Sequence, residues 1–116
     1  MNKETMFKSY ELLFEIETSL THILEIEMKN AHGPLWRKIF YVEGRTYLHD
    51  TISSFFRFAP LNDIFSSYEL QELRTLINIR NKICHMILIS SEEFQTLKGC
   101  HSIVLQKGSK QHYIIK

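Results

Sequence analysis

Apolar residues recur every three or four positions across residues 4–30, which predicts one long amphipathic helix. Glutamates occupy most of the opposite side, and we interpret them as a solvated face. The stretch "NAHGP" ends this helix, because Gly33 can adopt a left-handed conformation and Pro34 cannot continue the hydrogen-bond ladder. The expected buried stripe comprises Met6, Tyr10, Leu13, Ile16, Leu20 and Leu24, broadened by Phe7, Phe14 and Ile23.

Two shorter apolar segments follow the long helix. Residues 35–44 fit either a brief helix or a strand-like connector. Residues 46–58 show a second helical stripe, which ends at Ala59-Pro60 because the residue before a proline avoids the helical conformation. The aromatic residues of this segment have apolar neighbours, which favours a place in the core or in a dimer surface. The apolar positions are Leu48, Ile52, Phe55 and Phe56, followed by Phe58.

Two capping boxes mark further helix starts. Ser66 with Glu69, and Ser90 with Glu93, each pair a serine with a glutamate three residues later. The first box predicts a helix through "SSYELQELRTLINIRNKICHMI", and the second predicts a short helix to about Leu97. Gly99 is expected to close the second helix. The predicted buried face of the first comprises Leu70, Leu73, Ile77 and Cys84, widened by Leu76 and Ile83.

The last residues change character. The β-prone stretches "SIVLQ" and "QHYIIK" flank "KGSK", which predicts a β-hairpin over about residues 102–116. A lone hairpin is marginally stable, so it must pack on the helices or pair across a subunit boundary. We therefore expect residues 1–116 to form one mainly α domain, a bundle of four to five helices with a small C-terminal β-hairpin.

Composition and charge argue against several classes of binding partner. A net charge of +1 over 116 residues provides no strong global field for nucleic acid, so any polyanion site must be local. Neither a signal-peptide pattern nor an apolar run of membrane-spanning length is present, and Cys84 and Cys100 form no CxxC pair. We expect a cytoplasmic chain with free thiols, no cofactor, no metal, and no membrane or DNA partner. Metal binding at Cys100-His101 with His112 is disfavoured, because zinc sites need four ligands in a tighter pattern.

The sequence "RNKICH", residues 80–85, places a guanidinium, an amide and an imidazole at the end of a predicted core helix. Asn81 and His85 are four residues apart and therefore share a helical face. Arg80 lies about 140° around the helix from His85, but its side chain is long enough to curl toward the same groove. We expect the three side chains to line a shared cleft at the edge of the buried stripe.

These side chains suit RNA cleavage without a metal, in which the 2′-hydroxyl attacks the adjacent phosphate. Histidine moves protons near neutral pH, and the arginine fork binds phosphate oxygens as negative charge develops. The amide of Asn81 would hold the phosphate or the imidazole. One copy of these three residues provides few catalytic groups, whereas a homodimer would bring two copies together.

The motif resembles the signature of the HEPN superfamily, an Arg followed after four to six residues by His, often with a polar residue just after the Arg. The stretch "LRTLINIRNKICHMILISSEEF" is similar to the corresponding region of its abortive-infection (Abi-like) members. The resemblance implies a mostly helical fold, a homodimer with facing motifs, and metal-independent endoribonuclease activity. It assigns catalytic roles to Arg80, Asn81 and His85. It further implies a toxin or antiphage role, with an antitoxin or regulatory protein as an additional partner.

Simpler interpretations stay open beside the nuclease. Arg80 and His85 could be a surface arginine and a half-buried histidine on an ordinary core helix. The chain could be a non-catalytic module that binds a protein or nucleotide in the same groove, or a purely structural dimerisation domain. The basic tail, with Lys107, Lys110 and Lys116, is interpreted as protection of an edge strand rather than as an RNA contact.

Overall fold

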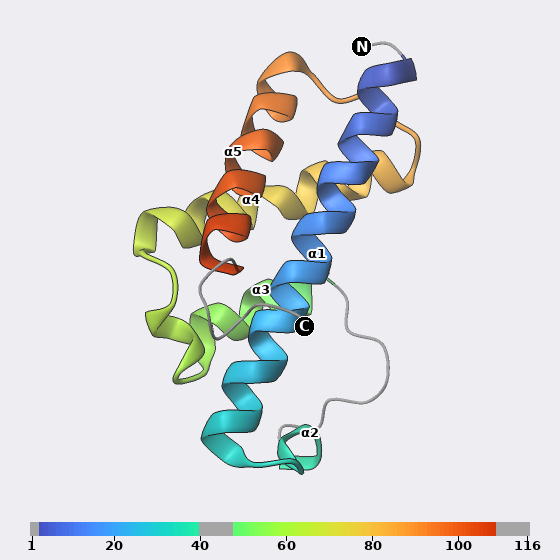
Figure 1. Ribbon diagram of the computed structural model, residues 1–116. Coiled ribbons are helices and arrows are strands. Elements are labelled where there is room, and N and C mark those ends of the chain that lie inside the picture. Colours follow the sequence, from blue (N-terminus) through green and yellow to red (C-terminus); the bar gives the residue numbers. More distant parts are fainter. Residues whose placement is uncertain (1–2, 40–47, 109–116) are drawn as a thin grey trace.

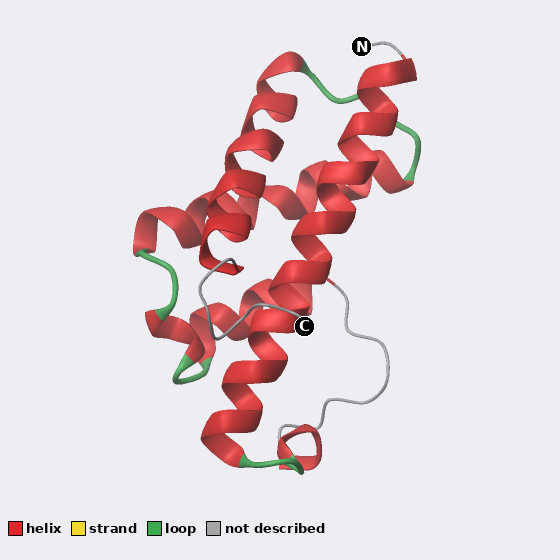
Figure 2. Ribbon diagram, in the orientation of Figure 1, coloured by secondary structure: helices red, strands yellow, loops and turns green. Residues whose placement is uncertain are grey.

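A computed structural model describes residues 3–39 and 48–108, and it confirms the mainly α fold expected from the sequence. Within these residues every regular element is a helix, and the molecule measures 45 × 29 × 27 Å (Figures 1 and 2). The elements are α1 (Lys3–His32), α2 (Trp36–Ile39), α3 (Leu48–Arg57), the 3₁₀ helix η1 (Leu61–Asp63), α4 (Ser67–Cys84) and α5 (Ser91–Gly108).

Helix α1 runs the length of the molecule, and α3, α4 and α5 pack against one side of it (Figure 1). Helix α5 lies beside the N-terminal half of α1, where His101 pairs with Glu15 at 3.2 Å. Helices α4 and α5 form an antiparallel pair, whose two ends are joined by the ion pairs Lys82–Glu93 at 2.8 Å and Lys107–Glu69 at 3.8 Å. The C-terminal part of α4 lies beside the middle of α1, where Arg80 pairs with Glu17.

The core lies where α1, α3, α4 and α5 meet. The rings of Phe55 in α3 and Phe65 before α4 meet edge to face, with centroids 5.3 Å apart. Leucine and isoleucine fill most of the remaining space, as expected for close-packed helices. The fully buried large side chains are Phe55, Ile16, Leu20, Ile23, Met28, Ile52, Leu61, Leu73, Leu76, Ile83, Leu97 and Val104.

The buried face of α1 differs from the predicted stripe. Leu13, Ile16 and Leu20 are buried as expected, but Phe7, Tyr10 and Phe14 are exposed. Their places in the core are taken by residues that the pattern left out, including Leu12 and Met28. Helix α1 thus has two apolar sides, and the described helices pack against the one rich in aliphatic residues.

The local signals at helix ends are confirmed. The backbone N–H of Glu69 donates to Ser66 Oγ at 3.1 Å, and the N–H of Ser66 donates to Glu69 Oε1 at 2.8 Å. Ser90 and Glu93 repeat this arrangement at the start of α5. Gly33 ends α1 in a left-handed conformation with φ 86°. The connector includes the short helix α2, while its residues 40–44 lie outside the described residues.

The prediction for the C-terminal part is wrong where the structure describes it. Helix α5 continues through Gly99 to Gly108, so residues 102–106 are helical rather than a β-strand. Leu97, Cys100 and Val104 are buried at helical spacing, and their packing outweighs the cost of a glycine inside a helix, about 1 kcal/mol. Residues 109–116, which contain the remainder of the predicted hairpin, lie outside the described residues.

Candidate functional site

Two isoleucines set the orientation of the C-terminal half of α4. Ile79 and Ile83 are buried, and each residue advances about 100° around the helix. Arg80 therefore lies at the edge of the buried face, while Asn81 and His85 are exposed on the opposite side. Cys84 is also exposed, which corrects its predicted place in the buried stripe. The apolar face at this end of the helix follows Ile79 and Ile83 instead.

The backbone holds His85 just beyond the last turn of α4. His85 is the C-cap, and its N–H donates to the carbonyl of Asn81 at 3.1 Å. The next two backbone N–H groups donate hydrogen bonds to carbonyls of the last helical turn. The N–H of Met86 donates to Ile83 O at 3.1 Å, and the N–H of Ile87 donates to Lys82 O at 2.8 Å. This is a Schellman motif, with Met86 at the left-handed position, φ 59°. The imidazole consequently projects from a fixed helix end.

Arg80 is held from α1 by a carboxylate. Its Nε lies 3.7 Å from Glu17 Oε1, close enough for an ion pair but too far for a hydrogen bond. The same Nε is buried and has no hydrogen-bond partner among the described residues. A buried donor without a partner is costly, so the guanidinium gains when a stronger acceptor arrives. Arg80 is thus positioned but incompletely satisfied.

Arg80 and Asn81 line the same small hollow of about 20 Å³, together with Leu48 and Ile77. His85 lies more than a turn further along and does not line this hollow. Within one molecule the structure therefore brings two of the three predicted site residues together. The third is exposed to solvent at the adjacent helix end.

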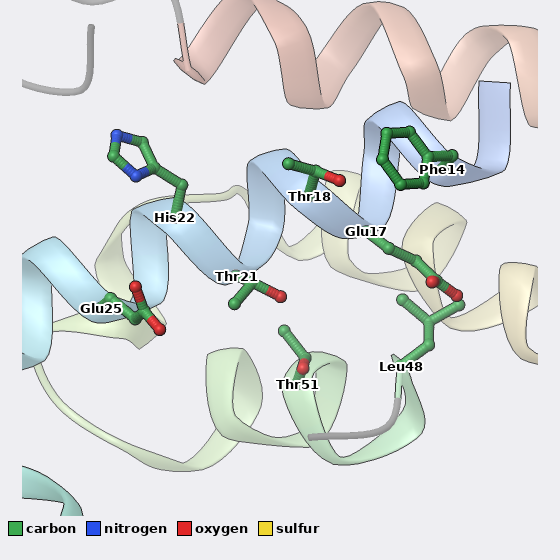
Figure 3. A pocket seen from close by; sticks show the side chains of 8 residues that line it. All are labelled: Phe14, Glu17, Thr18, Thr21, His22, Glu25, Leu48 and Thr51. Atoms are coloured by element: carbon green, nitrogen blue, oxygen red, sulfur yellow. The ribbon is translucent and has the colours of Figure 1, made fainter. Parts of the chain in front are cut away.

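A larger groove of about 430 Å³ lies beside the hollow, between α1 and α3 (Figure 3). Leu48 lines both spaces, and Glu17 lines the groove while contacting Arg80. Thr21 of α1 and Thr51 of α3 lie opposite each other in its middle (Figure 3). Most of the lining residues carry a polar group, although apolar atoms make up the larger part of the lining surface. The residues are Phe14, Glu17, Thr18, Thr21, His22, Glu25, Leu48 and Thr51.

The sequence analysis did not identify this groove. Phe14 was placed in the core and Glu17 on a solvated face, whereas the first is exposed and the second contacts Arg80. One signal was available: Phe7, Tyr10 and Phe14 share a helical face that the more regular aliphatic stripe does not need. No sequence signal indicated that Glu17 would contact Arg80, because Arg80 lies on a helix that is distant in the sequence.

Other reactive groups lie away from these spaces. Burial raises the pKa of the Cys100 thiol to about 12, and its Sγ donates to the carbonyl of Glu72 at 3.4 Å. That thiol is consequently a poor nucleophile near neutral pH. Among residues 3–39 and 48–108, no three His, Cys, Asp or Glu side chains converge as metal ligands would. Over the same ranges, no helix has both the length and the apolar character needed to cross a membrane.

Comparison with known proteins adds no further constraint. The chain matches no protein-family model, and neither a curated protein sequence nor a solved structure is significantly similar to it. What it does is therefore inferred from its own residues and their geometry.

Proposed function

We propose that this chain is a metal-independent endoribonuclease of the HEPN type, active as a homodimer. The observation that carries the proposal is the arrangement at the end of α4. Asn81 and His85 are exposed on one side of the helix, next to an Arg80 that Glu17 positions without satisfying. His85 is not a packed core histidine, so a role in stabilising the core does not explain it.

The proposed reaction needs a base and an acid. The 2′-oxygen attacks phosphorus, its proton passes to the neutral His85 imidazole of one subunit, and the bond from phosphorus to the 5′-oxygen breaks. The imidazolium of His85 in the second subunit protonates the leaving 5′-oxygen. The products are a 2′,3′-cyclic phosphate and a 5′-hydroxyl. Positioned proton transfer of this kind contributes about 10²–10⁴-fold to the rate.

Arg80 would stabilise the negative charge that develops on the phosphate oxygens. Glu17 contacts its Nε, which leaves the two terminal nitrogens as the fork that binds phosphate. Asn81 lines the same hollow and would donate an amide hydrogen bond to the phosphate. Because phosphate accepts charge-assisted hydrogen bonds and the contact at 3.7 Å is not one, the guanidinium can engage substrate without losing a hydrogen bond to Glu17.

The loop after His85 supports self-association. Met86, Ile87 and Leu88 are all exposed, although each is a large apolar residue. Consecutive exposed apolar side chains are typical of a surface that is covered in an assembly. If two copies cover these loops mutually, their His85 residues approach each other, and the acid and base required above come from the two subunits.

The proposal is tested by incubating purified protein with mixed RNA in EDTA. We expect His85→Ala and Arg80→Ala each to reduce cleavage at least 100-fold, with 2′,3′-cyclic phosphate ends on the wild-type products. His32→Ala, at the far end of α1, is the matched control and should cleave normally. Intact RNA with the wild-type protein, or equal cleavage by all variants, would overturn the nuclease assignment.

One observation favours a second candidate, a non-catalytic module. His85 does not share the hollow of Arg80 and Asn81 within one molecule. A binding module needs only the hollow and the groove, so His85→Ala would then leave ligand affinity unchanged while Arg80→Ala lowers it. A toxin or antiphage role, with an antitoxin or regulatory protein as partner, belongs to the nuclease proposal and has the same test.

A further inference from the structure

The groove between α1 and α3 continues from the hollow of Arg80 and Asn81. Leu48 forms part of both walls, and the Glu17 carboxylate lies between the groove and the Arg80 guanidinium. We propose that this groove binds the nucleoside of single-stranded RNA next to the phosphate held by Arg80, with its base stacked on Phe14. This inference rests on the proposed nuclease function and assigns the substrate contact that selects the cleavage position.

The size of the groove fits one nucleoside. Its volume of about 430 Å³ falls within the range of small-molecule sites, roughly 300–1,000 Å³. The groove is partly open to solvent rather than an enclosed cavity. An unpaired nucleotide can reach such a groove, whereas a base inside a duplex cannot.

The polar lining favours a base and ribose over a phosphate in the groove. Glu25 is paired with Arg37 and Glu17 with Arg80, so neither carboxylate in the groove is an isolated charge. Carboxylate oxygens still accept hydrogen bonds from the amino groups of bases, whereas a phosphate has no hydrogen to donate to them. Thr18 and Thr21 offer hydroxyl groups that can bond to the ribose 2′-hydroxyl. The cationic Arg80 lies next to the groove rather than within its lining, which separates the phosphate position from the base position.

Phe14 is placed for stacking. Its side chain is 69% exposed, although burial of a phenylalanine ring would stabilise the fold. The ring stands at the end of the groove shared by Glu17 and Leu48, while Glu25 lies at the other end (Figure 3). Aromatic side chains next to a phosphate site are the usual platform for unpaired bases. A base on Phe14 is therefore adjacent to a phosphate at Arg80.

Binding is measured separately from cleavage. Each variant is made in a His85→Ala background, and its affinity for a fluorescein-labelled RNA hexamer of mixed sequence is measured by fluorescence anisotropy in EDTA. We expect Phe14→Ala to weaken binding roughly 5- to 150-fold, the range found for removal of one stacked base. Phe14→Trp should retain binding, because indole also stacks.

Phe7→Ala is the matched control. Phe7 is 64% exposed on the same side of α1 but does not line the groove, so its loss should leave affinity unchanged. Equal weakening by both alanine variants, or none by Phe14→Ala, would overturn the assignment. Hexamers of adenine should bind more tightly than hexamers of uracil, since adenine presents an exocyclic amino group to the carboxylates.

The outcomes distinguish this inference from the nuclease proposal. If the wild type cleaves RNA and Phe14→Ala has unchanged kcat and KM, the groove assignment fails and the nuclease stands. If the wild type never cleaves but Phe14→Ala loses affinity and Phe7→Ala does not, the groove stands as a binding site and the nuclease fails. If the wild type does not cleave RNA and Phe14→Ala binds as tightly as the wild type, both proposals are overturned.

Discussion

Met86 has a backbone conformation that residues other than glycine rarely adopt. It is in the left-handed region at φ 59°, and its side chain is 81% exposed. That backbone conformation costs about 1–2 kcal/mol for a residue with a Cβ atom. This unfavourable conformation occurs next to His85, at the helix end where we propose the active site. Strain of this kind is common at functional positions, where a side chain is needed at a defined place.

We expect Met86→Gly to raise the free energy of unfolding by about 0.5–1 kcal/mol. Glycine adopts the left-handed conformation without steric cost, and within a single subunit little buried surface is lost with the exposed methionine. The comparison is made at concentrations where the chain is monomeric, so that the proposed subunit contact of Met86 does not contribute. Urea unfolding followed by circular dichroism measures the change. Gly33→Ala, the reverse change at φ 86°, should destabilise by a similar amount. A Met86→Gly protein less stable than wild type would show that the side chain contributes packing within this chain.

At the scale of elements, the pair of α4 and α5 holds the candidate site residues Arg80, Asn81 and His85. Each helix begins with a capping box, and Lys82 of α4 donates a hydrogen bond to Glu93 of α5 at 2.8 Å. The hydrogen bond from Lys82, and next the backbone N–H of Ser90, lower the pKa of Glu93 below its ordinary value of 4.5. One carboxylate therefore caps α5 and ties it to the turn of α4 that carries Arg80 and Asn81.

The lowered pKa of Glu93 makes the stability of this pair depend on pH. Because the folded-state pKa lies below the unfolded value, the stabilising contribution is present above pH 4.5 and is lost as pH falls through the folded-state pKa. Glu93→Gln should therefore lose less stability than wild type between pH 5 and pH 3, as measured by urea unfolding at each pH. Glu92→Gln, in the same first turn, is the control and should follow the wild-type curve. Identical curves for Glu93→Gln and wild type would contradict the role of this carboxylate.

At the scale of the whole molecule, exposed apolar side chains form the surface that we propose a second copy covers. The loop from Met86 to Leu88 presents three of them directly after His85. The proposed chemistry requires this surface to be shared, since each subunit has one His85 and the reaction needs both an acid and a base. Assembly and cleavage should therefore be lost together.

Leu88→Asp is expected to prevent the proposed dimer from forming and to reduce the proposed RNA cleavage at least tenfold, because a charge buried in an apolar interface is costly. Sedimentation velocity measures the mass at the concentrations used for cleavage. Leu35→Asp is the matched control: Leu35 is 62% exposed and Leu88 59%, but Leu35 lies just beyond the C-terminal end of α1 and not in the loop between α4 and α5. A wild-type monomer that cleaves RNA would contradict the shared site.

The sequence predicted most of what depends on neighbouring residues. Ser66 with Glu69, and Gly33 before Pro34, mark helix ends correctly because capping involves groups within one turn. The position of Asn81 and His85 on one face of α4 also follows from helical spacing. The first expected strand, residues 102–106, was wrong because β-branched residues there suggested a strand, whereas burial of Val104 at helical spacing decided for helix α5.

The sequence by itself therefore determined where helices begin, that the fold is mainly helical, and which residues carry candidate chemistry. Only the tertiary structure decided which side of α1 is buried, that Glu17 contacts Arg80, and that Phe14 stands at a groove beside them. The physical reason is the separation in sequence between the residues that interact. Caps and periodicity are set by contacts within a few residues, whereas burial and ion pairing depend on which distant helix packs against each face.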